Sequence, residues 1–192
     1  MAHAKPNPDA ELDEDGIVIQ KHRSRVLVVV PPEEFGDESL RYARSSLHNV
    51  HVGTRVVSTT YDREVKGRLQ DEFLVDGTLS EASMEDYSGV IFAGGEGAAA
   101  LADDPDALRL AVEAARAGKL IGAWGHALGI LARAGVVKGH KVTGDPSARD
   151  AVKRAGGKFT GRQLEKSGPV VTSRDDAVGM RFGKALAEIV GI

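Results

Sequence analysis

The chain has 192 residues, of which 42% are hydrophobic and 28% are charged, as is ordinary for a globular protein with one domain. Its formal net charge is −3, and it lacks the basic stripe that nucleic-acid binding would normally require. Cysteine is absent, which excludes disulfides, thiolate metal sites and every mechanism that uses a cysteine nucleophile.

Residues 1–24 form a polar segment rich in proline and acidic side chains. Such a segment cannot bury enough apolar surface to offset the entropy lost on ordering, so we expect an arm that is mobile or held by a neighbouring subunit. Residues 16–19 are the one stretch of the arm able to dock as an edge strand. The chain has no secretory signal and no apolar run near the roughly 20 residues that span a bilayer, so we expect a cytoplasmic protein without membrane contact.

The domain is predicted to begin at residue 25 with a strand at 26–30, whose continuous β-branched character is typical of a strand buried on both faces. Asp37 is predicted to cap a helix over 38–50. A second strand follows at 54–59. Residues 68–79 are predicted to form a small hairpin that turns at Asp76-Gly77.

A third buried strand is predicted at 89–93, and it runs directly into a glycine-rich loop. Asp104 and Pro105 are typical of a helix start, and Gly118 is typical of a helix end, so a helix is expected between them. A fourth strand is predicted at 120–124.

The rest of the chain continues the alternation of helices and strands. Helices are predicted at 126–134, 146–155 and 177–190, with short strands at 141–143 and 170–172. This alternation predicts an α/β fold with a doubly wound, mostly parallel sheet, helices on both faces and the small hairpin in addition. Sheets of this class place their sites at the carboxyl ends of the strands.

Three predicted strand ends are therefore candidates for the site: residues 33–37, 93–97 and 123–127. The third passes at once from a strand into a helix, which is the geometry of a nucleophile elbow. The residue at such an apex has a strained backbone that projects its side chain from the top of the sheet. Here the apex is Gly125, so no side chain projects.

These segments resemble the ThiJ/PfpI superfamily, which has a flavodoxin-like, class I glutamine amidotransferase-like fold. Ile91–Gly97 is similar to the family's loop of a hydrophobic residue, proline and two glycines. Residues 118–144, GKLIGAWGHALGILARAGVVKGHKVTG, are similar to its stretch around Ala-Ile-Cys-His-Gly, and Val171–Arg174 to its C-terminal signature. The resemblance covers residues 25–192.

The resemblance assigns roles to several positions. This sequence differs from the family at the positions of the catalytic residues. The family has its cysteine nucleophile at the position of Gly125, and an acidic residue that tunes the thiol at the position of Gly36. A small shift of the alignment would let Glu33 or Glu34 supply that carboxylate.

Part of the family's binding frame is retained. His126 matches the family's histidine, and Gly94 and Gly95 match the loop whose backbone N–H groups form an oxyanion hole. Ala127 stands where the family has glycine. The residues expected to bind a ligand are therefore Gly94, Gly95, Gly125, His126 and Ala127.

Two functions follow from this pattern. One is a non-catalytic member, or pseudoenzyme, that binds a small molecule or acts in stress or as a scaffold. The other is a hydrolase, hydratase or glyoxalase-like enzyme in which His126 or Glu34 activates water. A replacement nucleophile at Thr172 or Ser173 is a weaker alternative, because neither has an obvious base, and chaperone-like holding is another.

The sequence indicates no cofactor and no metal site, since the histidines lack ligand spacing. Trp124, the one tryptophan, is expected to pack at the base of the elbow or in a subunit contact. Self-association as a homodimer or larger homo-oligomer is implied by the resemblance.

Overall fold

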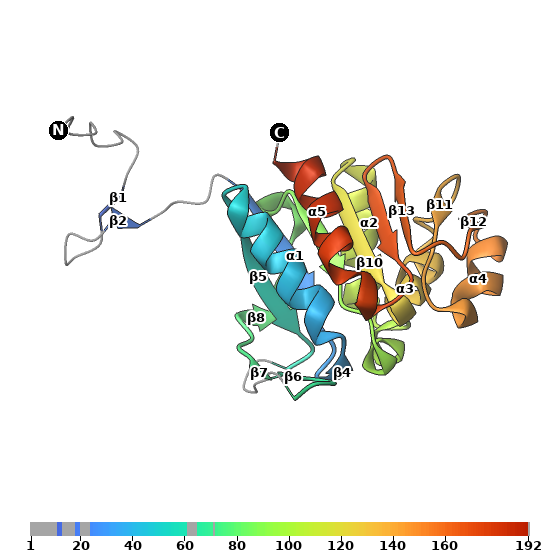
Figure 1. Ribbon diagram of the computed structural model, residues 1–192, viewed down its shortest axis with the longest axis horizontal. Coiled ribbons are helices and arrows are strands. Elements are labelled where there is room, and N and C mark those ends of the chain that lie inside the picture. Colours follow the sequence, from blue (N-terminus) through green and yellow to red (C-terminus); the bar gives the residue numbers. More distant parts are fainter. Residues whose placement is uncertain (1–10, 13–17, 20–23, 61–64, 71, 192) are drawn as a thin grey trace.

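The computed structural model describes residues 11–12, 18–19, 24–60, 65–70 and 72–191. A seven-stranded sheet forms the centre of the domain (Figure 1). Its strands, in spatial order, are β13 (Leu164–Ser167), β14 (Val170–Ser173), β10 (Leu120–Trp124), β9 (Gly89–Phe92), β3 (Ser24–Val29), β5 (Val52–Ser58) and β8 (Gly77–Thr78). All neighbours are parallel except β13 and β14, so the predicted mostly parallel sheet is confirmed.

Helices cover both faces of the sheet. α1 (Asp37–Asn49) and α5 (Gly179–Val190) lie side by side on one face, and α2 (Pro105–Arg116) and α3 (Leu128–Arg133) lie on the other (Figure 1). α4 (Arg149–Arg154) stands at the end of the molecule near β11 (Lys141–Val142) and β12 (Lys158–Phe159), which pair in parallel.

The two faces follow from the apolar run of β3. Successive side chains of a strand point to opposite faces. Val26 and Val28 belong to the core cluster with the α1 and α5 side chains, whereas Leu27 and Val29 belong to the cluster with α2 and α3. All four are fully buried, which explains why this strand has no polar alternation in the sequence.

The predicted small hairpin exists, but its turn is elsewhere. β6 (Val65–Gly67) and β7 (Glu72–Phe73) pair antiparallel, and β6 also pairs with β4 (Glu33–Phe35). Asp76-Gly77 is not the turn, because Gly77 begins strand β8 of the main sheet. Instead the Asp76 carboxylate accepts a hydrogen bond from the Val56 N–H at 2.7 Å, which ties the segment to β5.

The start of α1 also differs from the prediction. Asp37 is the first helical residue rather than the cap, and Gly36 at the cap position provides no side chain. The carboxylate of Asp176 caps the helix from the far end of the chain, since it accepts the Ser39 N–H at 2.7 Å and the Glu38 N–H at 3.3 Å. The Asp37 carboxylate is buried and accepts the Leu69 N–H at 2.8 Å.

α3 and α4 match their predicted places but have different starts. The predicted helix 126–134 begins with a 3-10 turn, η3 (Gly125–Ala127), before α3. The predicted helix 146–155 begins likewise with η4 (Pro146–Ala148) before α4. Further 3-10 turns are η1 (Met84–Asp86), η2 (Glu96–Leu101) and η5 (Asp176–Val178).

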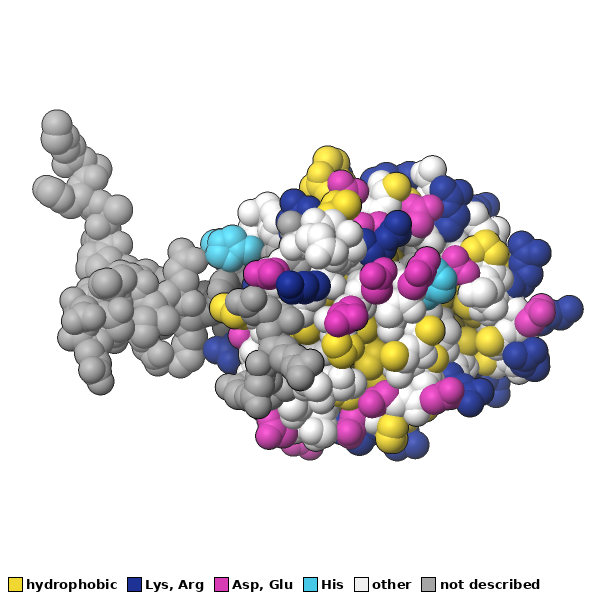
Figure 2. Space-filling model, turned by 90° about the horizontal axis from the view of Figure 1, so that it is seen from below, with side chains coloured by type: hydrophobic (Ala, Val, Ile, Leu, Met, Phe, Trp, Pro, Cys, Tyr) yellow, Lys and Arg dark blue, Asp and Glu magenta, His cyan; other side chains and the backbone are white. Residues whose placement is uncertain are grey.

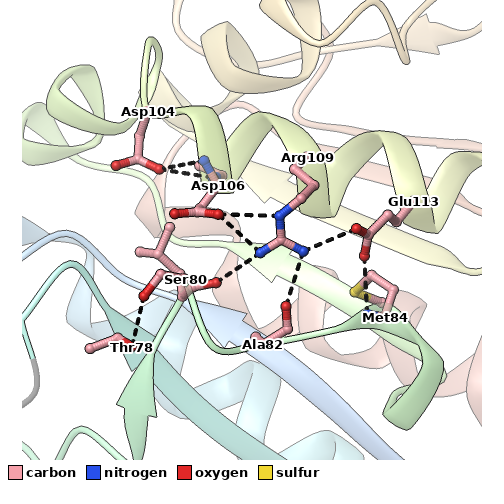
Figure 3. Close-up of polar contacts among 10 residues, drawn as sticks. Thr78, Ser80, Ala82, Met84, Asp104, Asp106, Arg109 and Glu113 are labelled. Atoms are coloured by element: carbon pink, nitrogen blue, oxygen red, sulfur yellow. Dashed lines mark hydrogen bonds and ion pairs between the residues drawn. The ribbon is translucent and has the colours of Figure 1, made fainter.

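Arg109 on α2 anchors the segment that precedes β9 (Figure 3). Its guanidinium donates to the backbone oxygens of Ala82 at 3.0 Å and Leu79 at 3.2 Å. It also pairs with the carboxylates of Asp106 and Glu113 on the same helix. Of the five hydrogen bonds from this planar group, two hold a loop without regular structure against α2, and three fix the guanidinium on the helix itself.

In the N-terminal segment, β1 (Glu11–Leu12) pairs antiparallel with β2 (Val18–Ile19). β2 is the described part of the edge strand predicted at 16–19, and it pairs with β1 rather than with the main sheet. The predicted mobility of the arm concerns residues that are mostly outside the described ones. No helix in the described part of the chain is long and apolar enough to cross a membrane.

Candidate functional site

The predicted strand ends meet at one end of the sheet, where β4, β6 and β7 also lie (Figure 1). Figure 2 views the molecule from this end and shows acidic side chains interspersed with exposed apolar ones. β3, β9 and β10 are adjacent parallel strands, so the loops after them come together here. The candidate residues from three separate segments therefore share one region.

Gly125 directly follows β10 and has φ of +55°, the left-handed conformation expected for the apex of an elbow. A Cβ added at this position would have two atoms within 4 Å beyond its chain neighbours: the Gly95 nitrogen at 3.8 Å and the Arg174 carbonyl oxygen at 3.9 Å. Both are ordinary van der Waals distances. The elbow therefore keeps the backbone of a nucleophile position and has room for a Cβ.

Gly94 and Gly95 are held against the elbow by close backbone approaches. A Cβ on Gly94 would stand 1.8 Å from the Trp124 carbonyl oxygen, and one on Gly95 would stand 2.1 Å from the Glu34 carbonyl oxygen. No other residue fits at either position without moving the backbone. These contacts place the Gly95 nitrogen beside the space above Gly125.

Gly36 lies where two other side chains converge. A Cβ on Gly36 would stand 2.5 Å from Oδ1 of Asp176 and 2.7 Å from Nε1 of Trp124. An acidic residue cannot be placed at position 36 unless these groups shift. The carboxylate beside this position is thus contributed by Asp176, which follows the last strand of the sheet and was not identified from the sequence.

Trp124 packs on the α1 and α5 side of the sheet. Its indole is 1% exposed and meets the Phe182 ring edge-on, with 5.6 Å between centroids. Phe35 belongs to the same core cluster. The packing place predicted for Trp124, at the base of the elbow, is where the indole lies.

His126 lies beside a carboxylate that the sequence did not reveal. Its Nε2 is 3.6 Å from Oδ2 of Asp145, and both side chains are about one-third exposed. The Asp145 N–H donates to the Gly125 carbonyl oxygen at 3.0 Å, so the pair is fixed directly to the elbow. Asp145 precedes Pro146 and caps η4 through Ser147, and this helix-start pattern was its only signal in the sequence.

The Asp145 carboxyl is held in its ionised form. Partial burial alone would raise its pKa, but the hydrogen bonds from Ser147 and the nearby His126 outweigh that effect. The pKa of Asp145 therefore lies below its ordinary value. A carboxylate beside His126 can hold the imidazole in one ring orientation.

The remaining candidates are not gathered around Gly125. The side chains of Glu33 and Glu34 are exposed, and neither forms a hydrogen bond or ion pair with a described residue. Glu34 has φ of +62°, which turns its carbonyl oxygen toward Gly95. Ala127 is buried in the turn after the apex.

Thr172 and Ser173 are fully buried at the end of β14. The Thr172 hydroxyl accepts the Thr143 N–H at 2.9 Å, and the Ser173 hydroxyl donates to the Asp175 carbonyl oxygen at 3.4 Å. Both hydroxyls therefore form hydrogen bonds with backbone groups. Among the described residues, no three His, Asp or Glu side chains gather closely enough to hold a metal ion.

Comparison with known families agrees with this geometry. The model of the DJ-1/PfpI family matches residues 24–189, which is nearly the whole described domain. The chain belongs to the DJ-1/PfpI family.

Solved structures and sequence relatives are similar over most of the chain. A ThiJ/PfpI domain protein from Brachyspira murdochii is 23% identical with a TM-score of 0.82, covering 86% of this chain and 95% of that one. Drosophila melanogaster DJ-1beta is 22% identical with a TM-score of 0.76, covering 88% and 91%. An uncharacterized protein of Methanocaldococcus jannaschii is 29% identical over 163 residues, covering 83% of this chain and 79% of that protein.

Proposed function

We propose that this protein is a non-catalytic DJ-1/PfpI-family member that binds a small carbonyl or carboxylate compound at the elbow. The observation that carries the proposal is that the apex at Gly125 has room for a Cβ, next to the Gly95 nitrogen. A backbone N–H at this place can donate to a carbonyl or carboxylate oxygen. Because no nucleophile stands at position 125, a bound carbonyl cannot form a thiohemiacetal or an acyl intermediate there.

A binding experiment tests whether a ligand binds at Gly95 and Gly125. Trp124 is the one tryptophan and directly precedes Gly125, so its fluorescence should change saturably on titration with glyoxylate. Gly125→Ala would place a methyl group 3.8 Å from the Gly95 nitrogen and should weaken this binding. Gly129→Ala in α3 is the matched control, because a methyl group there meets nothing within 4 Å. Absence of saturable binding to the unaltered protein would refute the proposal.

Turnover assays test the absence of catalysis. The protein at high concentration should not convert methylglyoxal or glyoxal, and should not cleave peptides, above the rate of its His126→Gln variant. Saturable activity that His126→Gln abolishes would show that the protein is an enzyme.

The contact between His126 and Asp145 favours a second candidate function, a cysteine-independent hydratase or hydrolase. The charged Asp145 carboxylate could hold the imidazole so that it removes a proton from water attacking a carbonyl bound at Gly95. General-base catalysis of this kind contributes about 10²–10⁴-fold. This candidate predicts that Asp145→Asn and His126→Gln reduce turnover together, whereas Glu34→Gln leaves it unchanged.

A further inference from the structure

A basic surface covers the end of the molecule that α4, β11 and β12 form. Figure 2 shows Lys and Arg side chains gathered at this end, which is the right-hand end in Figures 1 and 2. Residues 138–158 contain two Asp but six Lys or Arg, all exposed: Lys138, Lys141, Arg149, Lys153, Arg154 and Lys158. These six side chains, called the basic surface below, include none of the residues assigned to the elbow site.

The fold brings these cations together from separate elements. Lys141 and Lys158 are register partners in the parallel pair of β11 and β12, so their side chains lie side by side on one face. Val142, the next residue of β11, points to the other face and is buried in the core. After α4 the chain returns to the same place, where the Cβ position of Gly156 lies 3.3 Å from Cγ of Lys138.

The charges of the basic surface are not balanced. Within the described part of the chain, five of the six side chains take part in no ion pair or hydrogen bond: Lys138, Lys141, Lys153, Arg154 and Lys158. The sixth, Arg149, stacks on the Phe159 ring at 5.3 Å. The dipole of α4 favours the two cations in its last turn. It does not explain the facing lysines of β11 and β12, because like charges opposite each other on paired strands destabilise a sheet.

The chain itself contains a matching anionic segment. Of the seven residues 9–15, five are acidic and none is basic. Every copy of the protein therefore carries one basic surface and one acidic segment, always in equal numbers. Complementary charges of this kind steer association and select the partner.

The reach of the acidic segment favours the basic surface of another copy. The segment is joined to β3 at Ser24, and β13 is four strand spacings from β3, with β11 and β12 beyond it. At about 4.8 Å for each of six spacings, the straight path is about 29 Å. An extended chain advances about 3.3 Å per residue, so residue 15 reaches at most about 30 Å from Ser24. Because the arm has to pass around the outside of the domain, it falls short of its own basic surface.

We infer that residues 9–15 of one copy bind the basic surface of a second copy. Carboxylates of the arm pair with the lysines and relieve the repulsion between Lys141 and Lys158. The arm and the surface are different parts of the chain, so two copies either exchange arms in a closed dimer or join head to tail. The contact goes beyond the proposed function, since it involves no elbow residue.

Sedimentation velocity of the full chain at about 20 mM and about 500 mM salt tests the electrostatic origin of the contact. Association should weaken at least about tenfold at the higher salt concentration, because exposed charges are screened. Lys141→Gln with Lys158→Gln should weaken it about tenfold at the lower one. Arg68→Gln with Arg116→Gln is the matched control, because it removes two exposed cations elsewhere and should leave association unchanged.

A charge exchange tests the direct contact between copies. The arm-reversed variant carries Asp9→Lys, Glu11→Lys, Asp13→Lys, Glu14→Lys and Asp15→Lys. The surface-reversed variant carries Lys138→Glu, Lys141→Glu, Lys153→Glu, Arg154→Glu and Lys158→Glu. Each variant alone should sediment with the mass of one chain, since its arm and surface then have the same charge. An equal mixture should associate again, because each arm now meets an opposite surface on the other variant.

The inference is overturned if the unaltered protein has the mass of one chain at about 100 μM in low salt, or if the mixture of reversed variants does not associate. An assembly that is indifferent to salt and to the surface substitutions also overturns it, and would assign the contact between copies to another surface and leave the basic surface for an external polyanion. The elbow site is tested separately, since both reversed variants should bind glyoxylate as the unaltered protein does.

Discussion

Gly95 and Gly125 are both glycines with positive φ, of 124° and 55°, yet different physical constraints act on them. At Gly95 the Glu34 carbonyl oxygen occupies the place of a side chain. At Gly125 a Cβ would make only ordinary van der Waals contacts, so the left-handed backbone is what disfavours an alanine there. Packing therefore dictates glycine at position 95 and does not dictate it at position 125.

This difference predicts unequal effects of two alanine substitutions. Gly125→Ala should lower the free energy of unfolding by about 1 kcal/mol, the cost of a left-handed alanine. Gly95→Ala should lower it by about 3 kcal/mol or more, because its methyl group would overlap the backbone. Urea denaturation of both variants measures the contrast. Equal losses would mean that the space above Gly125 is not open.

Gly125→Cys would restore the family's nucleophile position without its carboxylate partner. The Glu33 and Glu34 side chains are exposed and form no hydrogen bond or ion pair with a described residue. The Asp176 carboxylate accepts hydrogen bonds from the N-terminus of α1. We expect a thiol with a pKa near its ordinary value of about 8.5 and little catalysis. Thiolate absorbance against pH measures this. A strongly lowered thiol pKa that returns to normal in the Asp176→Asn background would assign the tuning role to Asp176.

Site residues could be predicted from the sequence where they are neighbours within one recognisable segment. Gly125 and His126 are neighbours in the elbow motif, and Gly94 and Gly95 are neighbours in one loop, so their convergence follows from the parallel sheet. Asp145 and Asp176 could not be found in this way. Each comes from a loop distant in the sequence, and no motif links its position to that of the elbow.

At the scale of elements, α1 depends on a residue near the other end of the chain. The Asp176 carboxylate and backbone receive three hydrogen bonds from residues 38 and 39. Gly179 and Gly183 in α5 allow the two helices to approach closely, since a Cβ on either would overlap α1. The start of α1 and the start of α5 therefore form one unit.

Asp176→Ala should destabilise the protein by about 1–2 kcal/mol, the usual cost of removing a helix cap. Hydrogen exchange should rise most in the first turn of α1. Asp150→Ala, in the exposed first turn of α4, is the control and should have a small effect. Equal destabilisation by the two changes would contradict the role of Asp176 as the cap.

The Arg109 cluster predicts a pH dependence of stability. Burial alone would raise the pKa of Glu113, but the hydrogen bonds from Arg109 and the Met84 N–H hold it below its ordinary value. A carboxyl with a lowered folded-state pKa contributes stability above its unfolded pKa and loses that contribution as pH falls through the folded pKa.

Glu113→Gln should therefore destabilise the protein near pH 7, by less than about 1 kcal/mol because the pair is partly exposed. The difference from the unaltered protein should shrink below about pH 4. Thermal unfolding at both pH values measures this. A difference that stays constant with pH would show that the charge of Glu113 contributes nothing.

Element boundaries were predictable where local chemistry decided them. Asp104 and Pro105 start α2 as expected, and the Asp104 carboxylate accepts the Asp106 and Ala107 N–H groups. Asp76-Gly77 misled the hairpin prediction because tertiary contact overrode the turn signal: Asp76 bonds to β5 across the sheet. Short strands such as β4, β12 and β13 have too few residues to show a period.

At the scale of the whole molecule, the alternation of apolar strands with amphipathic helices was enough to predict the central sheet. β9 and β10 are buried along their whole length, and β3 along its last four residues, and these stretches are apolar in the sequence. The antiparallel edge strand β13 was missed because its sequence, Leu164-Glu165-Lys166-Ser167, is polar, as suits a strand at an edge. The N-terminal arm gave no such pattern.

We expect the protein to form a homodimer or larger homo-oligomer, as the family resemblance implies. Tyr42 on α1 and Met180 on α5 are large exposed apolar side chains on the same helical layer, which suits a contact between copies. Light scattering after gel filtration should give at least twice the mass of one chain. A single-chain mass at concentrations of about 100 μM would contradict this expectation.

Because the apex at Gly125 has room for a Cβ, a single base substitution can change the chemistry of this position. In the genetic code, a glycine codon GGU or GGC becomes a cysteine codon, UGU or UGC, by one base substitution, and becomes a serine codon by another. Because the backbone at the apex already has the required shape, such a mutation would add a nucleophile with only the modest penalty of a left-handed side chain. A single mutation can thus add or remove a nucleophilic side chain at this position without rebuilding the domain.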